Sequence, residues 1–475
     1  MSRRPLAAGL LTAAALMLTV VAPGLAADAA SATASYGTGS SAPATTATPV
    51  LSARRMPDLL ASYKADAQLG AALQPILAQA TPTTCLTVHA QGRTIMASNG
   101  NLAVMPASTE KLLTATAVLD RMGPDAVLTT TAVSSATPSG GVLDGDLYVI
   151  GSGDPLLATT GYTSTFDEPN EPYNDYAQLA DHIKAAGITE IHGNVVGDES
   201  RFDTQRYLPS WPHRYITASE VGPVGALMVN DGYTGLSLHP DAPAPMRKPG
   251  DPAPLAAETL ISLLRSRGVQ VTGTPSSGTA PAGAATVATL DSKPMSVNVD
   301  EMLRRSDNTT AEVLNKDLAT LDSQPGTTAN GAKVVRATLD HLGFPTDGAV
   351  TIDGSGLDLG NRVTCDLLVA ALDHQGADSA VANDLPVAGR TGTLRKRLKG
   401  TAADGKVRAK TGTLNDVSAL AGFATTAAGQ QLTFAFVING SLATAQNLTD
   451  DVAVALAQYG AGIAVDQLGP AQGPS

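Results

Sequence analysis

The chain has 475 residues, of which 43% are hydrophobic, and a formal net charge of −12 at pH 7. This length is enough for two or three domains, each with its own hydrophobic core. The acidic balance argues against a nucleic acid as the partner.

The amino-terminal stretch Met1–Ala27 has the pattern of a secretory signal peptide. Two arginines precede the apolar run Leu6–Val21, and Pro23 with small residues suits a cleavage site. An uncleaved membrane anchor is the alternative, since the run is nearly long enough to span a bilayer, and membrane association is expected only in that case. Both readings predict an exported protein, extracellular or associated with the cell envelope. Residues 28–55, rich in small residues and proline, predict a flexible linker.

The folded region is expected to begin near Met56. Residues 59–79 carry apolar side chains at helical spacing and predict a helix. Residues 85–90 and 94–98 predict two strands joined by a tight turn at residues 91–93, which is an antiparallel hairpin.

The chain contains two cysteines, Cys85 and Cys365. Outside the cytoplasm an even number of cysteines permits a disulfide bond. Two separate buried thiols are the alternative, because the sequence does not place the two residues within bonding distance.

The stretch Pro106–Met122 predicts a buried helix that carries a candidate nucleophile. Ser108 and Lys111 are three residues apart and therefore share one face of this helix. A buried lysine loses solvation, its pKa falls, and in its neutral form it is a base beside a hydroxyl. The pattern Ser-x-x-Lys alone is common by chance, so further motifs must support it.

Residues 123–290 predict an insertion of one or two small α/β domains, because a connecting loop would be far shorter. Strands are expected at Val127–Val133, Asp146–Ile150, Ile191–Val196 and Leu236–His239, and helices at Asp175–Ala186 and Pro254–Arg267.

A second candidate motif, Ser306-x-Asn308, stands between two predicted helices, the second of which covers residues 311–318. The same pattern occurs at Ser296-x-Asn298, where a helix begins and a serine is simply a good cap. We prefer Ser306 because it lies ahead of the second helix.

The third motif is the run Lys410, Thr411, Gly412 and Thr413, at the start of a predicted three-stranded meander. Strand alternation places Lys410 with Gly412 on one face and Thr411 with Thr413 on the other. The run that begins at Arg390 is a near copy, but its continuation is basic and not typical of a strand.

Taken together, the three motifs resemble those of the D-alanyl-D-alanine carboxypeptidase/endopeptidase family with inserted domains, the low-mass class C penicillin-binding proteins. Further matching stretches are Gly151–Pro155, Asp353–Leu357 with Asn361-Arg362, and Ala388–Arg397. The resemblance extends from about residue 56 to residue 464. It implies an α+β fold, with a β-lactamase/transpeptidase-like antiparallel sheet flanked by helices. The catalytic domain would comprise residues 56–122 and 291–464, with a tail at residues 465–475.

The resemblance also implies a mechanism of serine acyl transfer. Ser108 would attack the carbonyl carbon of the penultimate D-alanine, and Lys111 would take its proton. Ser306 would relay a proton to the leaving nitrogen, and Asn308 would bind the peptide. The acyl-enzyme on Ser108 would then be hydrolysed by water, whereas penicillin would stay attached.

The family resemblance assigns substrate binding to the third motif. Lys410, Thr411 and Thr413 would hold the terminal carboxylate, with Gly412 between them. The oxyanion hole would be formed by the backbone N–H groups of Ser108 and Thr413. The implied partners are peptidoglycan stem peptides and cross-links, with β-lactam antibiotics as covalent inhibitors.

Two other functions compete with this interpretation: a serine β-lactamase or esterase on the same fold, and a non-catalytic cell-wall binding protein. A binding module has no need of a lysine beside Ser108, and a β-lactamase rarely carries so long an insertion. The seven histidines are scattered without ligand spacing, so no metal and no cofactor are expected.

The insertion is expected to serve positioning, because the motif residues all lie outside it. Its two ends should be close in space, so a short linker in its place should leave acylation by penicillin detectable but lower the cleavage of natural wall peptides. Asp144, Asp146 and Asp154 are acidic candidates for binding the amino end of a wall-peptide side chain, with ordinary surface acids as the alternative.

Overall fold

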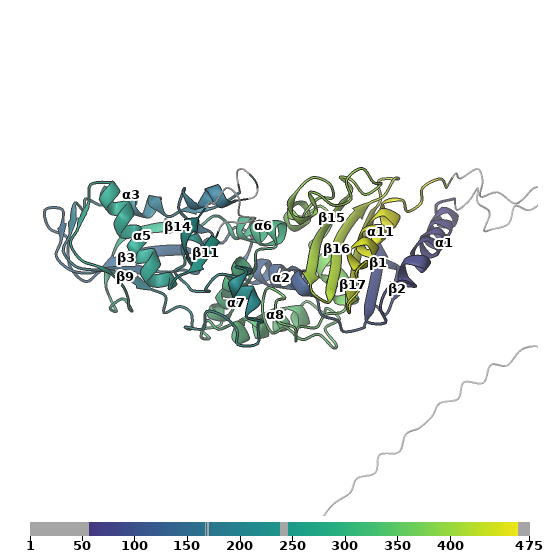
Figure 1. Cartoon of the computed structure of the whole chain (residues 1–475), viewed down its shortest axis with the longest axis horizontal. Coiled ribbons are helices and arrows are strands. Elements are labelled where there is room, and N and C mark those ends of the chain that lie inside the picture. The colour runs from purple at the N-terminus through teal and green to yellow at the C-terminus, as the bar shows by residue number, and fades with distance from the viewer. Residues whose placement is uncertain (1–56, 167, 169–170, 238–245, 464–475) are drawn as a thin grey trace, which may run out of the picture. The chain divides into compact units, whose positions relative to one another are not determined.

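The computed structural model describes residues 57–166, 168, 171–237 and 246–463, and all structural statements below refer to these residues (Figure 1). The expected signal peptide, linker and carboxyl-terminal tail lie outside the described residues. The fold is α+β, as the sequence predicted.

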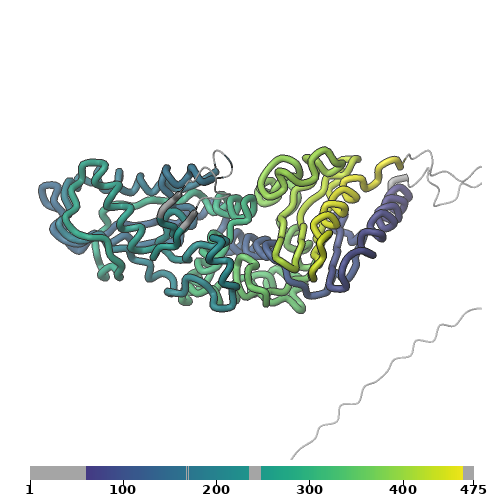
Figure 2. Tube along the Cα trace, viewed as in Figure 1, coloured from purple at the N-terminus to yellow at the C-terminus, as the bar shows by residue number. Residues whose placement is uncertain are grey.

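The amino-terminal hairpin and three carboxyl-terminal strands together form an antiparallel five-stranded sheet in the order β15-β16-β17-β1-β2. Figure 2 shows the amino-terminal hairpin lying beside the carboxyl-terminal strands. The predicted hairpin and meander are both confirmed. The strands are β1 (Thr84–Ala90), β2 (Arg93–Ser98), β15 (Val407–Leu414), β16 (Val417–Thr425) and β17 (Gln431–Asn439).

Helices cover both faces of this sheet, and strand alternation explains why both faces are apolar. On β17, Phe434 and Phe436 belong to the core cluster under α1 (Pro57–Leu77) and α11 (Ala445–Ala457). Ala435 and Val437 point to the other face, where α9 (Cys365–Gln375) packs. The sheet is therefore the middle layer between two helical layers.

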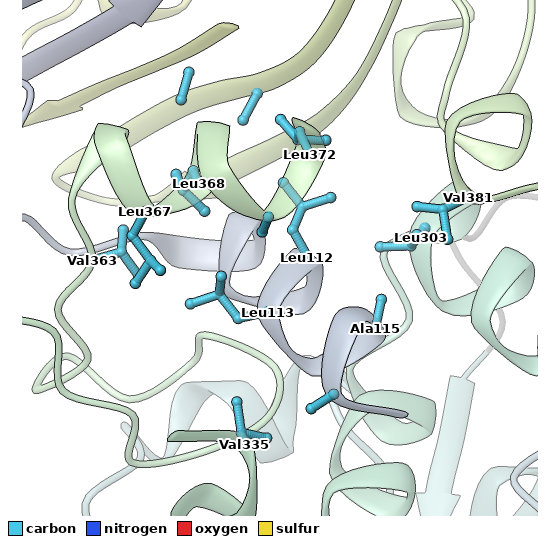
Figure 3. Close-up of a cluster of buried hydrophobic side chains, with 14 of the residues drawn as sticks. Leu112, Leu113, Ala115, Leu303, Val335, Val363, Leu367, Leu368, Leu372 and Val381 are labelled. Atoms are coloured by element: carbon cyan, nitrogen blue, oxygen red, sulfur yellow. The ribbon is translucent and has the colours of Figure 1, made fainter. Parts of the chain in front are cut away.

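The central helix α2 (Lys111–Met122) lies in the core on the α9 side of the sheet. Figure 3 shows Leu112, Leu113 and Ala115 of α2 among side chains of the surrounding elements. The predicted helix is confirmed, although its first turn, Ala107–Glu110, is a 3₁₀ turn. The surrounding helices are α6 (Met295–Arg305), α7 (Asn308–Leu321), α8 (Thr328–His341) and α10 (Ala380–Asp384).

The segment between α2 and α6, called here the intervening segment (residues 123–290), contains a second five-stranded sheet in the order β13-β9-β5-β3-β14. Its helices α3 and α5 pack on this sheet over a separate core cluster. These elements are β3 (Thr129–Ser134), β5 (Leu147–Ile150), β9 (Val195–Asp198), β13 (Pro275–Ser277), β14 (Ala285–Asp291), α3 (Ala177–Ala185) and α5 (Pro252–Ser266). Strand β14 pairs with β3, and Asp291 lies opposite Thr129, so the two ends of the segment are side by side as expected.

Smaller elements complete the intervening segment: β4 (Val142–Leu143), β6 (Leu157–Ala158), β7 (Asn174–Asp175), β8 (Glu190–Ile191), β10 (Tyr233–Ser237), β11 (Met246–Pro249), β12 (Gln270–Val271) and α4 (Arg214–Thr217). The prediction of one strand over Ile191–Val196 is wrong. The chain forms β8 and β9 there, in two different sheets, and Gly193 between them lies against the backbone of Gly145, where a side chain would not fit. The strand expected at 236–239 is β10 as far as residue 237, and the remainder lies outside the described residues.

Another core cluster joins the intervening segment to the helices around α2. Trp211, Tyr215 and Met228 of the intervening segment pack with Val313 of α7 and with Leu357. The segment therefore has one core of its own and shares a second with the rest of the fold.

The two cysteines form a disulfide bond between β1 and the first residue of α9, with their Cα atoms 5.8 Å apart. The question that the sequence left open is thereby answered. The bond connects residues 280 positions apart in the sequence.

Candidate active site

Ser108 lies in the 3₁₀ turn that precedes α2, directly after Ala107, whose φ of 48° is unusual for a residue with a side chain. Strand β15 passes very close to this turn. A Cβ atom at Gly412 would lie 2.7 Å from the carbonyl oxygen of Pro106, so only a glycine permits the approach. The third motif is thus packed against the turn that carries the nucleophile.

Lys111 is fully buried, and its Nζ donates hydrogen bonds to three oxygens. The acceptors are Ser108 Oγ at 3.1 Å, Asn308 Oδ1 at 2.6 Å and the carbonyl of Ser355 at 2.8 Å. Burial lowers the pKa of Lys111 to about 8, although nearby acids, Asp307 foremost, oppose this effect. At neutral to mildly basic pH, a useful fraction of this lysine is uncharged beside the serine hydroxyl.

Ser306 adopts a left-handed backbone conformation, with φ 62°, at the junction between α6 and α7. Its Oγ accepts a hydrogen bond of 2.7 Å from Lys410 Nζ, which also donates to the carbonyl of Thr411 at 2.9 Å. Burial, and secondly the charge of Lys111, hold the pKa of Lys410 well below its usual value. The competing Ser296 lies in the first turn of α6, at the opposite end of that helix.

Asn308 is the first residue of α7, and both ends of its side-chain amide have protein partners. Its Oδ1 accepts from Lys111, and its Nδ2 donates to the backbone carbonyl of Glu220 at 2.7 Å. Asp307 caps the same helix by accepting from Thr310 N at 2.6 Å. The side chain of Asn308 therefore connects Lys111 to the intervening segment, a role that the sequence interpretation did not include.

The loop that presents the Ser355 carbonyl to Lys111 is held by buried carboxyl groups. Glu312 Oε1 accepts from the backbone N–H groups of Gly354 at 3.0 Å and Ser355 at 2.8 Å. Asp353 accepts from Trp211 Nε1 at 2.8 Å. Burial raises the pKa of Glu312 to about 8 and also raises the pKa of Asp353. The Asp353–Leu357 stretch singled out in the sequence is therefore the loop that holds the Ser355 carbonyl beside Lys111.

A cleft of about 530 Å³ opens above these groups. Lys111, Lys410 and Gly412 are not part of its lining. Thr411 and Thr413 share the strand face that borders it, in agreement with the predicted alternation. The lining residues are Ser108, Arg214, Tyr215, Glu220, Arg305, Ser306, Asn308, Leu357, Thr393, Arg397, Thr411, Thr413, Leu414, Asn415 and Gln446.

Several lining residues were missed by sequence reasoning. Arg214, Tyr215 and Glu220 come from the intervening segment and carry no local signal of a site. Thr393 belongs to the near copy of the third motif, which was a signal that we set aside. As expected, Arg390 of that copy does not line the cleft, and its side chain is 65% exposed.

Asp154, a candidate for binding a wall-peptide amine, is not the surface acid that was the alternative. Its side chain is buried, and its carboxylate accepts hydrogen bonds from Asn174 Nδ2 and from the backbone N–H of Leu156. Burial raises the pKa of Asp154 to about 7. Asp144 and Asp146 do not line the cleft either. The acidic group of the intervening segment that does line it is Glu220.

Chemically, the site combines a hydroxyl, a buried amine that is partly uncharged near neutral pH, and a second serine–lysine pair. These are the components of nucleophilic catalysis with internal proton transfer. Within the described part of the chain, no three or more His, Cys, Asp or Glu side chains are grouped so that they could hold a metal ion.

Comparisons with known proteins agree on one family. A sequence model of the D-Ala-D-Ala carboxypeptidase 3 (S13) family matches residues 66–254 and 244–459. The D-alanyl-D-alanine carboxypeptidase of Actinomadura sp. (strain R39) is 30% identical over 460 residues, which cover 81% of this chain and 82% of that protein. The carboxypeptidase DacB of Mycolicibacterium smegmatis is 31% identical over 381 residues, covering 78% and 79%.

Solved structures agree at the level of the fold. The crystal structure of penicillin binding protein 4 from Haemophilus influenzae has a TM-score of 0.69 and 22% identity, covering 82% of this chain and 99% of that chain.

Proposed function

The chain belongs to the D-Ala-D-Ala carboxypeptidase 3 (S13) family, and from this premise we propose that it cleaves peptidoglycan peptides through an acyl-enzyme on Ser108. It is a serine-type D-Ala-D-Ala carboxypeptidase, a hydrolase. The single observation that carries the assignment of residues is the hydrogen bond of 3.1 Å from Nζ of the fully buried Lys111 to Oγ of Ser108, which lines the cleft.

In the acylation step, Ser108 Oγ forms a bond to the carbonyl carbon of the penultimate D-alanine. Uncharged Lys111 accepts the hydroxyl proton. The negative charge that develops on the carbonyl oxygen is bound by the backbone N–H groups of Ser108 and Thr413, and each such donor contributes roughly 3 kcal/mol. The packing of Gly412 against the turn before Ser108 supports this pairing, because it brings the two backbone segments together.

The leaving nitrogen receives a proton as its bond to the carbonyl carbon breaks. Ser306 Oγ donates this proton and takes one in turn from the buried lysine pair through its hydrogen bond to Lys410, so the pair gives up the one positive charge that Lys111 gained from Ser108. Water then attacks the acyl carbon and gives a proton to Lys111, the bond between that carbon and Ser108 Oγ breaks, and Ser108 Oγ takes the proton back from Lys111. Asn308 keeps Lys111 in position throughout.

The terminal carboxylate of the substrate binds at the face of β15 formed by Thr411 and Thr413, above the buried Lys410. Peptides and cross-links of peptidoglycan that end in D-alanine or join it to a diamino acid are the proposed substrates. β-Lactams present a carbonyl and a carboxylate with similar geometry and therefore act as covalent inhibitors on Ser108.

We also propose export to the cell envelope or beyond it, on the basis of the signal-like pattern at Met1–Ala27. Among the described helices, none combines the length and apolar character needed to cross a bilayer. Residues 123–290 are proposed to form the inserted part of the molecule, and residues 56–122 with 291–464 its catalytic domain.

Mass spectrometry of the intact protein after incubation with penicillin tests this function. We expect the mass to increase by one penicillin, with the adduct on the peptide that contains Ser108, and release of D-alanine from a stem-peptide substrate. An adduct that disappears within seconds would indicate a β-lactamase instead.

Two variants with matched chemistry test the assignment of the third motif. Lys410→Ala should abolish the adduct, because Ser306 loses its buried partner. Arg390→Ala, the corresponding change in the near copy, should retain it, since that side chain is exposed. Retention of the adduct in Lys410→Ala and loss in Arg390→Ala would overturn the assignment.

A further inference from the structure

We propose that Thr393 is a positioning residue that orients the hydroxyl of Thr411 toward the carboxylate of the substrate. The inference rests on the proposed function, because it concerns the recognition of that carboxylate. Thr393 comes from the near copy of the third motif and lines the same cleft as Thr411.

The geometry places the two threonines in direct contact. Thr393 Oγ1 and Thr411 Oγ1 are 2.7 Å apart, and both residues line the cleft. Thr411 is only 7% exposed, whereas Thr393 lies in the exposed rim of the cleft. Thr411 therefore exposes little of its surface, only where it lines the cleft, and Thr393 is the side-chain partner that the structure provides for its hydroxyl.

A hydroxyl has one hydrogen to donate and two lone pairs that accept. If Thr411 donates its hydrogen to a substrate carboxylate, it cannot also donate to Thr393. The hydrogen bond between the two residues must then run from Thr393 to Thr411. Thr393 thus selects the rotamer in which the Thr411 hydrogen faces the cleft. It also donates a hydrogen bond to a lone pair of the Thr411 hydroxyl oxygen, which would otherwise have no donor.

The turn that carries Thr393 is held on both sides. The backbone N–H of Gly392 donates to Glu168 Oε1 at 3.0 Å. Gly392 has φ 54°, and a Cβ atom there would lie 2.6 Å from the carbonyl of Arg304, close to the end of α6 that precedes Ser306. The turn is therefore packed between the intervening segment and α6. This packing restricts its movement, as a positioning residue requires.

Two thioester substrates of the acyl-D-alanyl type test the proposal on the full-length protein. One has thioglycolate as its leaving group, whose carboxylate takes the place of the terminal carboxylate, and the other has the methyl ester of thioglycolate. For Thr393→Val we expect kcat/KM for the carboxylate substrate to fall about tenfold, equivalent to about 1.4 kcal/mol. The value for the methyl ester should stay within a factor of two, so the ratio between the substrates changes.

Two further variants separate positioning from a disturbed turn. Thr393→Ser keeps the hydroxyl and should restore the ratio of the wild type. Thr391→Val makes the same change two residues away, where the hydroxyl accepts from Val387 N outside the cleft, and should affect both substrates equally. An unchanged ratio in Thr393→Val, an equal loss on both substrates, or failure of Thr393→Ser to restore the ratio would overturn the proposal. Failure of the wild type to turn over either thioester would instead refute the proposed function.

Discussion

Lys111 and Lys410 are both fully buried, yet their surroundings differ in a way that separates their roles. Lys111 has acidic groups nearby, Asp307, Asp353 and Glu312 among them, which favour its charged form against burial. For Lys410, both burial and the charge of Lys111 disfavour the ammonium form. Because two ammonium groups in one buried site repel each other, the two lysines are not both charged over an accessible range of pH.

The pKa of Lys111 predicts how acylation depends on pH. The proton acceptor must be uncharged, and a lysine with a pKa of about 8 is mostly protonated below that value. The rate of acylation of Ser108 by penicillin should therefore rise as the pH increases through about 8 and level off above it. Stopped-flow or quenched mass measurements between pH 6 and pH 10 provide the profile.

Asp307→Asn is the control for this pH profile. Asparagine can still cap α7, but the negative charge that raises the pKa of Lys111 is removed. The midpoint of the profile should therefore move to lower pH. A rate that does not change with pH, or a midpoint that moves upward in this variant, would contradict the role of Lys111 as the base.

At the level of elements, the disulfide joins an internal strand of the sheet to the helix that covers it. Cys85 of β1 and Cys365 of α9 are both buried in the core cluster around α2. A cross-link between residues so distant in the sequence restricts the unfolded chain strongly. We expect reduction of the bond to lower the free energy of unfolding by about 2 to 5 kcal/mol.

Thermal melts of the wild type with and without a reductant measure this effect. The reduced protein keeps both sulfur atoms in place, so no cavity complicates the comparison. The Cys85→Ala/Cys365→Ala protein should melt at one temperature under both conditions. If the reductant leaves the melting temperature of the wild type unchanged while the thiols become titratable, the disulfide does not stabilise the fold.

At the scale of the whole molecule, the intervening segment takes part in the site more directly than the sequence interpretation allowed. The carbonyl of Glu220 accepts from Asn308, which holds Lys111. The indole of Trp211 donates to Asp353, in the loop that presents a carbonyl to the same lysine. These contacts indicate that removal of the segment would slow acylation as well as the cleavage of wall peptides.

Replacement of residues 123–290 by a short Gly/Ser linker should therefore slow acylation by penicillin at least tenfold. The physical reason is the loss of the contacts that hold Asn308 and Asp353, and for the fully buried Asp353 the lost hydrogen bond costs about 1 to 3 kcal/mol. Circular dichroism and a cooperative melt establish whether the shortened chain folds.

Trp211→Phe serves as a milder variant that keeps the segment. It removes one hydrogen bond to Asp353 and should slow acylation without abolishing it. If the shortened protein folds and is acylated as fast as the full chain, the contacts to Glu220 and Trp211 have no role in the reaction.

Local patterns in the sequence were sufficient for much of the fold. The apolar spacing of residues 106–122 predicted the central helix, and alternation predicted the hairpin and the meander of the main sheet. These predictions succeed because helical and strand periodicities depend on neighbouring residues. The spacing of Ser108 and Lys111 also placed both side chains on one face, for the same reason.

Other features depend on contacts between residues far apart in the chain. The disulfide, the carbonyls of Ser355 and Glu220 beside the site, and the contact of Thr393 with Thr411 arise only when the elements pack together. Every residue has a backbone carbonyl, so no sequence pattern identifies which one accepts a hydrogen bond from a buried lysine. Motifs show which side chains are able to react, and the packing of distant segments decides which groups surround them.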